Sequence, residues 1–502
     1  MTEFVASHQE DSHLSRKERR ELAAKRAFAE PTNFDPNDYK TNLWLPLFLS
    51  LLLSLLSVAN PFLTFLASNL QSQNLYAGVA MQAGQVPYSD FFGTSGILFF
   101  LLTYLGSFFQ TSIGLALLQF VCLIIAGIFL HKILAYFACS REVANQLLSW
   151  FYLLIGTLNI GGITAPLYAL PFILSSVWFL VRYFERAVKD ESFIIFGIEA
   201  AFVFLIYPKA AILWVVSQLV ILVFNIRHRQ LARGIYQTLA SIFGFLLVLY
   251  SVGYYTFIEQ ILGLAVQQTF LFNFDFSFQL QSSLYLAIFL LVSGIFRGIF
   301  QSLFLPNRAS NAFIRVFVLL TMLLQTVFIV CNANGDWSQA TVLVPYGLIL
   351  IAMSLKEEEE REDFSYLGWS FYLPLLVVGF FIGQPVYQYI TQDFVREERQ
   401  EVAQYIQENT SQSDLIFAWD DSALLYLDAQ RFSSATVITA EPYLDTELSK
   451  STLVYDLNRT NAKYILVNKD IPVLEEVQTT LDSAYSELDL NLTQFRLYEK
   501  NN

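Results

Sequence analysis

A single carboxylate, that of Asp90, lies in a glycine- and aromatic-rich stretch that contains no lysine or arginine, GQVPYSDFFGTSG (residues 84–96). One lysine, Lys209, lies in a second short stretch, YPKAA, between two apolar runs. A carboxylate near a hydroxyl can act as a general base, and an ammonium group can neutralise the charge of a phosphate. Whether the two groups serve one reaction depends on the elements that carry them.

The elements around these residues are apolar enough to cross a membrane. The 502-residue chain is 55% hydrophobic and only 15% charged, and its mean hydropathy is positive, unlike that of an ordinary soluble domain. A helix needs about 20 apolar residues to cross a bilayer core of about 30 Å. We predict a polytopic α-helical membrane protein with eleven spans, at residues 43–66, 112–136, 143–160, 165–184, 193–207, 209–226, 235–257, 283–304, 313–331, 339–355 and 367–389.

The loops between these spans fall into two sets that differ in their content of lysine and arginine. With the N-terminus inside, the basic tail of residues 1–42 and nearly all loop lysines and arginines fall on the cytoplasmic side. The apolar run at residues 97–109 is too short to span comfortably, and counting it as a span would move Lys132 and Arg141 outside. We therefore predict a short surface helix there, within a first outer loop of residues 67–111, in a multi-pass protein of the plasma membrane.

The polar end of the chain then lies outside the cell. Residues 43–390 form the transmembrane domain, and residues 391–502 form a small extracytoplasmic α/β domain. In that domain a helix-like stretch, EERQEVAQYIQENT, precedes three strand-like stretches, LIFAW, KYILVN and FRLYEK.

The outer membrane face has few ionisable side chains. Lys209 is its one base, and its acids are Asp90, Glu259, Asp275 and Asp336. No histidine falls on this face and no cysteine lies there outside the spans, which excludes a Ser-His-Asp triad, a Cys-His dyad and a histidine-based zinc site. The sequence indicates no cofactor and leaves a role for a divalent metal open.

Glycosyl transfer from a lipid phosphate suits so small a set of groups. Glycoside hydrolysis uses two carboxyl groups, because an alkoxide-like leaving group is protonated as it departs. A lipid phosphate is already a good leaving group, so one carboxylate suffices as the base for the acceptor hydroxyl. Asp90 is the candidate base, and Lys209 is the candidate group for the departing phosphate, with inversion by single displacement. The alternative for Lys209 is a side chain that merely reaches the interface from the end of a span.

The stretch NLYAGVAMQAGQVPYSDFFGTSGILFFLLTYLG resembles the first outer loop of the GT-C superfamily of polytopic glycosyltransferases, of the protein-mannosyltransferase and aminoarabinose-transferase type. Looser resemblances follow in GGITAPLYALPF, YPKAAILW and NGDWSQATVLVPYGLIL, and the outer domain resembles the family's C-terminal domain. The resemblance implies a GT-C fold, a polyprenyl-phosphate-linked sugar donor and an essential acid at Asp90. For substrate binding we single out Tyr88, Lys209, Asp336 and Trp337.

The chain departs from this family in two places. Relatives often carry an acid in the second outer loop, where this chain has Thr164, Ala165 and Pro166, and often a histidine near the position of Trp337. Asp90 therefore carries more of the prediction than the other residues.

Two other function classes fit a polytopic chain. A transporter, flippase or ligase for a lipid-linked glycan would also need a polar cavity, but we find no internal repeat, and a folded outer domain is rare in transporters. A non-catalytic scaffold would use its loop acids to cap helices. We predict a transferase that acts on a glycan or wall-polymer acceptor, a cell-wall polysaccharide or teichoic acid, with no nucleic-acid partner.

Two features keep more than one interpretation. Glu199 lies within a predicted span, where an acid is costly, and it is either a satisfied interhelical group or part of a proton or substrate path. The aromatic stretch at residues 267–279 either closes over a lipid chain or belongs to an interfacial aromatic belt.

Overall fold

The computed structural model describes the chain from residue 39 with several gaps. The described residues are 39, 41–108, 111–271, 278, 280–304, 312–331, 337–355, 364–370, 373–391, 393–440, 447–459 and 461–501. The predictions made for the basic tail, for Asp275 and for Asp336 lie outside these residues.

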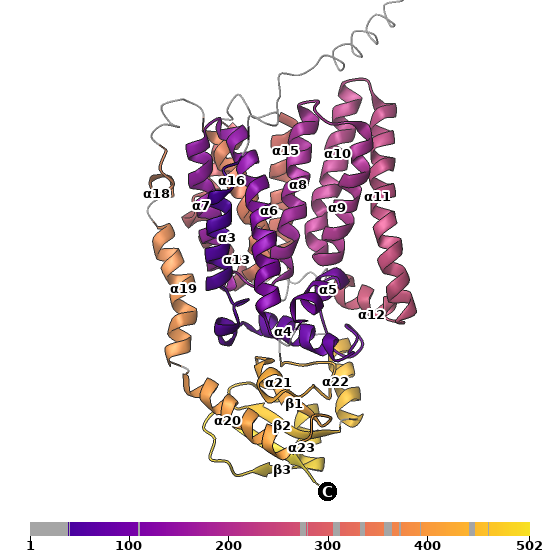
Figure 1. The fold of residues 1–502 in the computed structure, drawn as a ribbon, viewed down its shortest axis with the longest axis vertical. Helices are drawn as coiled ribbons and strands as arrows, with labels where there is room; N and C mark the ends of the chain where they lie inside the picture. The colour runs from indigo at the N-terminus through magenta and orange to yellow at the C-terminus, as the bar shows by residue number, and fades with distance from the viewer. Residues whose placement is uncertain are drawn as a thin grey trace, which may run out of the picture.

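A bundle of apolar helices carries a small α/β unit at one end (Figure 1). The bundle contains α3 (Trp44–Leu56), α6 (Ile113–Ala138), α7 (Arg141–Thr157), α8 (Ala165–Phe184), α9 (Phe193–Ile206), α10 (Ile212–Arg227), α11 (Leu231–Ile258), α13 (Leu280–Val292), α14 (Ile295–Phe304), α15 (Ala312–Val330), α16 (Leu343–Ser354), α18 (Tyr366–Trp369) and α19 (Pro374–Thr391). Large apolar side chains on its outer surface, among them many on α11, remain exposed, as expected for a surface that contacts lipid.

Six helical segments of the described chain are long and apolar enough to cross a membrane. A seventh results if the bent pair α13 and α14, which meet at 71°, is counted as one span. The predicted number of eleven also counts α3, α7, α9 and α19, which occupy the predicted positions but are shorter or less apolar.

Two predicted spans differ from straight helices. The run at residues 43–66 breaks after α3, because the Asn60 side chain accepts a hydrogen bond from the Phe62 amide and Pro61 begins a separate 3-10 helix, η3 (Pro61–Leu66). The run at residues 283–304 bends at Gly294, whose φ of +75° is readily accessible only to glycine.

Short elements at the same end of the bundle form a platform that faces the α/β unit. They are α4 (Asn69–Gln82), α5 (Ile97–Gly106), η5 (Asn159–Gly161), η7 (Pro208–Ala211), α12 (Leu262–Val266), the π-helix η8 (Gln267–Leu271) and η10 (Trp337–Val342). Figure 1 shows α4, α5 and α12 between the long helices and the α/β unit. The helix predicted within residues 97–109 is present as the ten-residue α5.

The α/β unit has one four-stranded sheet with the order β1-β2-β4-β3, in which β1 and β2 are parallel and the other pairs are antiparallel. Its elements are α20 (Asp393–Asn409), β1 (Leu415–Trp419), α21 (Leu424–Ala429), α22 (Glu447–Arg459), β2 (Ala462–Asn468), α23 (Glu475–Ala484), β3 (Tyr485–Leu488) and β4 (Phe495–Lys500). The three predicted strand-like stretches correspond to β1, β2 and β4, whereas the short, acid-containing β3 was not predicted.

A buried ion pair fixes α20 to the carboxyl ends of the parallel strands. Asp420, which directly follows β1, is fully buried, and its Oδ2 accepts hydrogen bonds from Arg399 at 2.9 Å and 2.8 Å. Its Oδ1 accepts from the Asn468 side chain, at the end of β2, at 2.9 Å. Removing one partner of such a pair leaves an uncompensated buried charge.

We expect Arg399→Met to lower the stability of the α/β unit by about 3–5 kcal/mol, because Asp420 loses its cation while buried. Pulse proteolysis of the full chain across a urea series would measure this change. The control is Arg496→Met, since Arg496 faces Glu487 at 3.8 Å in a half-exposed pair and should change stability by no more than about 1 kcal/mol. Equal effects of the two variants would contradict the prediction.

Candidate functional site

Asp90 closes a tight turn in the first outer loop. Its Oδ2 accepts a hydrogen bond from the Val86 amide at 2.7 Å, and its own amide donates to the Val86 carbonyl at 2.9 Å. Within the turn, the Tyr88 amide donates to the Phe91 carbonyl at 2.9 Å, and Tyr88 has a φ of +69°. The turn presents the Asp90 carboxylate on an exposed corner of the loop.

The residues around Asp90 leave its carboxylate open to solvent. The neighbours Phe91 and Phe92 are buried, whereas Asp90 is exposed, so they do not shield it from water. Nor does Asp90 cap the following helix, because α5 begins at Ile97 after Gly96 and has no side-chain cap. The structural part of its role is to close the turn.

The buried Tyr88 side chain stabilises the loop from within. Its side chain is 1% exposed, its hydroxyl donates to the Ser95 carbonyl at 2.8 Å, and its ring meets Phe100 edge-to-face at 5.4 Å. Burial raises the pKa of the Tyr88 phenol above its usual value, so the hydroxyl stays protonated as a donor. Direct binding of substrate by Tyr88 stays a prediction, and in this structure its hydroxyl is already bonded to the Ser95 carbonyl.

Gly96 brings the first loop against the end of α9. Its amide donates to the Ile206 carbonyl at 3.0 Å. A Cβ atom at this position would lie 2.0 Å from the Leu205 carbonyl oxygen, so only glycine permits the approach. The loop that carries Asp90 is thereby joined to the segment that leads into Lys209.

Lys209 lies buried in η7 and meets a segment 130 residues away in sequence. It is 1% exposed, and its Nζ lies 3.3 Å from the Oε1 of Gln339 in η10. The Tyr207 hydroxyl lies 3.5 Å from the same oxygen. Trp337, two residues before Gln339, packs edge-to-face against Tyr285 at 5.5 Å. The fold thus brings together Lys209 and the segment of Trp337, whereas Asp336 lies outside the described residues.

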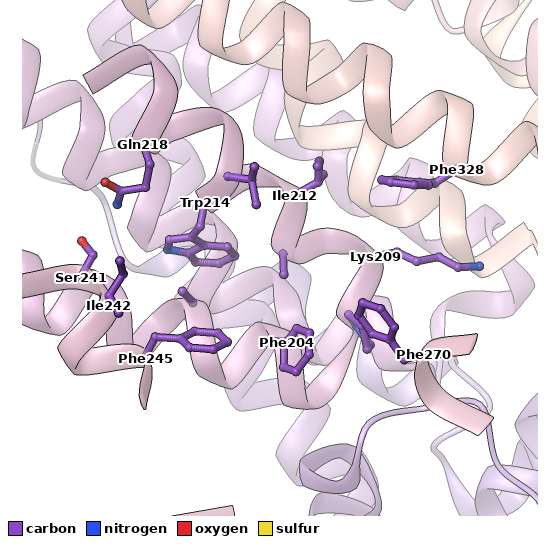
Figure 2. Close-up of a pocket in the computed structure, with 15 residues that line it drawn as sticks. Phe204, Lys209, Ile212, Trp214, Gln218, Ser241, Ile242, Phe245, Phe270 and Phe328 are labelled. Carbon is purple, nitrogen blue, oxygen red and sulfur yellow. The ribbon is translucent and has the colours of Figure 1, made fainter. Parts of the chain in front are cut away.

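An apolar cavity of about 380 Å³ begins beside Lys209. It lies among α9, α10 and α11 and is lined mainly by aromatic and aliphatic side chains, among them Phe204, Ile212, Trp214 and Phe245. Figure 2 shows Lys209 at one end, between Phe328 and Phe270, with its amine pointing away from the other apolar side chains. A cavity of this kind suits a hydrocarbon chain whose polar end lies near the amine.

Three side-chain amides that the sequence did not single out hold the second outer loop. Gln119, Gln71 and Asn74 donate to three successive carbonyls, those of residues 161, 162 and 163, at 2.8 Å, 2.8 Å and 2.9 Å. The loop contains two isoleucines with positive φ, at positions 160 and 163, a costly conformation that these contacts hold in place. The sequence signal that could have found these three residues was the presence of side-chain amides within an apolar chain.

The α/β unit is bonded directly to the first outer loop and to α4. The Phe92 amide donates to the Thr436 carbonyl at 2.8 Å, two residues from Asp90. The Ser433 amide donates to the Tyr76 hydroxyl at 3.0 Å. These contacts keep the α/β unit beside the exposed Asp90 turn.

Two further acids, Glu199 and Glu259, lie in different surroundings. Glu199 in α9 accepts hydrogen bonds from Ser175 at 2.6 Å and from Ser176, both in α8, which supports its interpretation as a satisfied interhelical group. Glu259 is exposed at the end of α11. Among the residues that the structure describes, no group of three or more His, Cys, Asp or Glu side chains could hold a metal ion.

Comparison with known proteins identifies a family and a fold. The family model described as "Putative competence-induced protein Ccs4 N-terminal domain" matches residues 39–393, and the model of the corresponding C-terminal domain matches residues 396–501. No curated protein matches the sequence.

Two solved structures of ArnT from Cupriavidus metallidurans are similar to this chain. The structure bound to undecaprenyl phosphate is 10% identical, with a TM-score of 0.53 over 91% of this chain and 97% of that one. The apo structure is 11% identical, with a TM-score of 0.51 over 86% and 93% of the two chains. The chain has the GT-C fold expected from its first outer loop.

Proposed function

We propose that this chain, which belongs to the Ccs4 family, is a membrane glycosyltransferase that takes a sugar from a polyprenyl-phosphate-linked donor. The observation that carries the proposal is the buried Lys209 at the end of an apolar cavity within a GT-C fold. A similar fold, that of ArnT, has been solved with undecaprenyl phosphate bound.

The donor is proposed to bind with its polyprenyl chain in the apolar cavity and its phosphate at Lys209. The cavity volume lies within the range of about 300–1,000 Å³ typical of ligand sites. The Lys209 amine donates to Gln339, and a buried cation is worth more to a phosphate than an exposed one. Trp337, two residues before Gln339 in η10, is proposed to contact the sugar.

The proposed reaction is a single displacement with inversion. The acceptor hydroxyl attacks the anomeric carbon, its proton passes to the Asp90 carboxylate, and the bond from that carbon to the phosphate oxygen breaks. The electron pair of the broken bond stays on the polyprenyl phosphate, whose added charge Lys209 offsets. Exposure of Asp90 supports its role, because the acceptor arrives from the aqueous side.

The acceptor is proposed to be a cell-wall polysaccharide or teichoic acid outside the plasma membrane. The α/β unit supports a large acceptor, since its contacts with the first outer loop and α4 place it beside the Asp90 turn. A transporter or flippase of a lipid-linked glycan is the second candidate. It would need the Lys209 site but no general base, so the two functions separate at Asp90.

We expect Lys209→Met to weaken binding of undecaprenyl phosphate by about 30-fold or more, because a phosphate then loses its buried cation. Lys209→Arg should retain part of the affinity, since the charge remains but its geometry changes. Ligand-dependent thermal shift of the purified protein measures both. Lys132→Met, on the predicted opposite face, is the control. Wild-type affinity in Lys209→Met would mean that this lysine only reaches the interface.

We expect Asp90→Asn to lower the transfer rate by about 10²–10⁴-fold, because an amide cannot take the proton of the acceptor hydroxyl. The Asn oxygen can still accept from the Val86 amide, so the turn and the melting temperature should stay close to wild type. Transfer from a polyprenyl-phosphate-linked sugar to isolated wall polymer gives the rate. Glu259→Gln, which changes another exposed acid of this face, should be active. A fully active Asp90→Asn protein would mean that Asp90 is not the general base.

We expect the α/β unit to lie outside the cell. An introduced Ser483→Cys, exposed in α23, should react with an impermeant maleimide on intact cells. The native exposed Cys139, at the end of α6 on the predicted cytoplasmic side, should react only after lysis. The reverse labelling pattern would mean that the topology is the opposite of the predicted one. The site would then face away from its proposed acceptor.

A further inference from the structure

Gln268 holds both sides of the Asp90 turn. Its Nε2 donates to the Tyr88 carbonyl at 2.9 Å, and its Oε1 accepts from the Gly93 amide at 3.0 Å. The side chain is 8% exposed and lies 175 to 180 residues from its partners in sequence. A primary amide carries both a donor and an acceptor, so it can satisfy a carbonyl and an amide at once.

These two contacts bracket the candidate base. Tyr88 precedes Asp90 by two residues and Gly93 follows it by three, so Gln268 fixes the chain on either side of the carboxylate. The bond to the Tyr88 carbonyl also holds a residue whose φ of +69° is unfavourable for an aromatic side chain. The orientation of Asp90 therefore depends on a side chain from a different outer loop.

The same short element reaches the cavity. Gln268 belongs to the π-helix η8, the next residue Thr269 donates to the Ser95 carbonyl at 3.4 Å, and Phe270 lines the cavity that begins beside Lys209. π-helical turns are rare and often lie at functional sites. Three successive residues thus contact the Asp90 loop and the wall of the apolar cavity.

We infer that Gln268 is a positioning residue that sets the Asp90 carboxylate relative to a sugar phosphate bound at Lys209. This inference rests on the proposed function. Gln268 touches neither reactant. It acts by holding the turn, and a small misplacement of a general base costs rate more than affinity.

Two substitutions of Gln268 separate positioning from general support. Gln268→Met keeps the volume and loses both hydrogen bonds, and should lower kcat by about 10- to 100-fold while leaving the KM for the lipid donor close to wild type. Gln268→Glu, when ionised, accepts from Gly93 but cannot donate to the Tyr88 carbonyl. Its activity relative to wild type should rise as the pH falls through the range in which a buried carboxyl protonates, because the acid regains a donor.

The matched control is Gln267→Met. Gln267 is the adjacent glutamine of the same π-helix and makes neither contact with the Asp90 loop. An equal loss of kcat in Gln267→Met, a loss expressed in KM alone, or a pH-independent activity ratio for Gln268→Glu would overturn the inference.

Amide hydrogen exchange distinguishes failure of this inference from failure of the proposed function. In the wild-type full chain, the hydrogen-bonded amides of the turn, those of Val86, Tyr88, Asp90 and Gly93, should exchange slowly, and Gln268→Met should speed their exchange while Gln267→Met should not. If the wild type transfers no sugar, the proposed function fails, and this measurement still tests whether Gln268 holds the turn. Unchanged exchange in Gln268→Met would overturn the positioning role in either case.

Discussion

Irregular backbone at the end of a membrane bundle must have its polar groups satisfied by the protein itself. Here side-chain amides meet much of that demand. Gln71, Asn74 and Gln119 bind the carbonyls of the second outer loop, and Gln268 binds a carbonyl and an amide of the first. An amide supplies hydrogen bonds without a charge, so it avoids the larger cost of burying an ion. The shape of this end of the bundle depends on these few side chains.

The two candidate functional groups lie in different environments. Lys209 is buried in η7 beside an apolar cavity, whereas Asp90 lies on an exposed corner of the first loop. Gly96 joins the two regions, because its lack of a side chain lets the loop lie against the end of α9. A lipid phosphate and a water-borne acceptor would require such a division, with the cation on the membrane side and the base on the aqueous side.

The α/β unit is part of the same arrangement. Its contacts through Thr436 and Ser433 reach the first loop and α4 next to the Asp90 turn. The buried pair of Arg399 and Asp420 fixes its helix α20 to the carboxyl ends of the parallel strands. The first outer loop is therefore held both by Gln268 and by the α/β unit.

The sequence by itself determined the membrane class, the short α5, the strands β1, β2 and β4, and the GT-C resemblance, because hydrophobic period and run length are local properties. It also singled out Asp90 and Lys209 by residue type. Only the tertiary structure decided that Tyr88 is buried and Asp90 exposed, that Gln339 meets Lys209, and that Gln268 brackets the turn. The contacts of Gln339 and Gln268 join segments 130 to 180 residues apart, and neither composition nor periodicity carries information about such pairings.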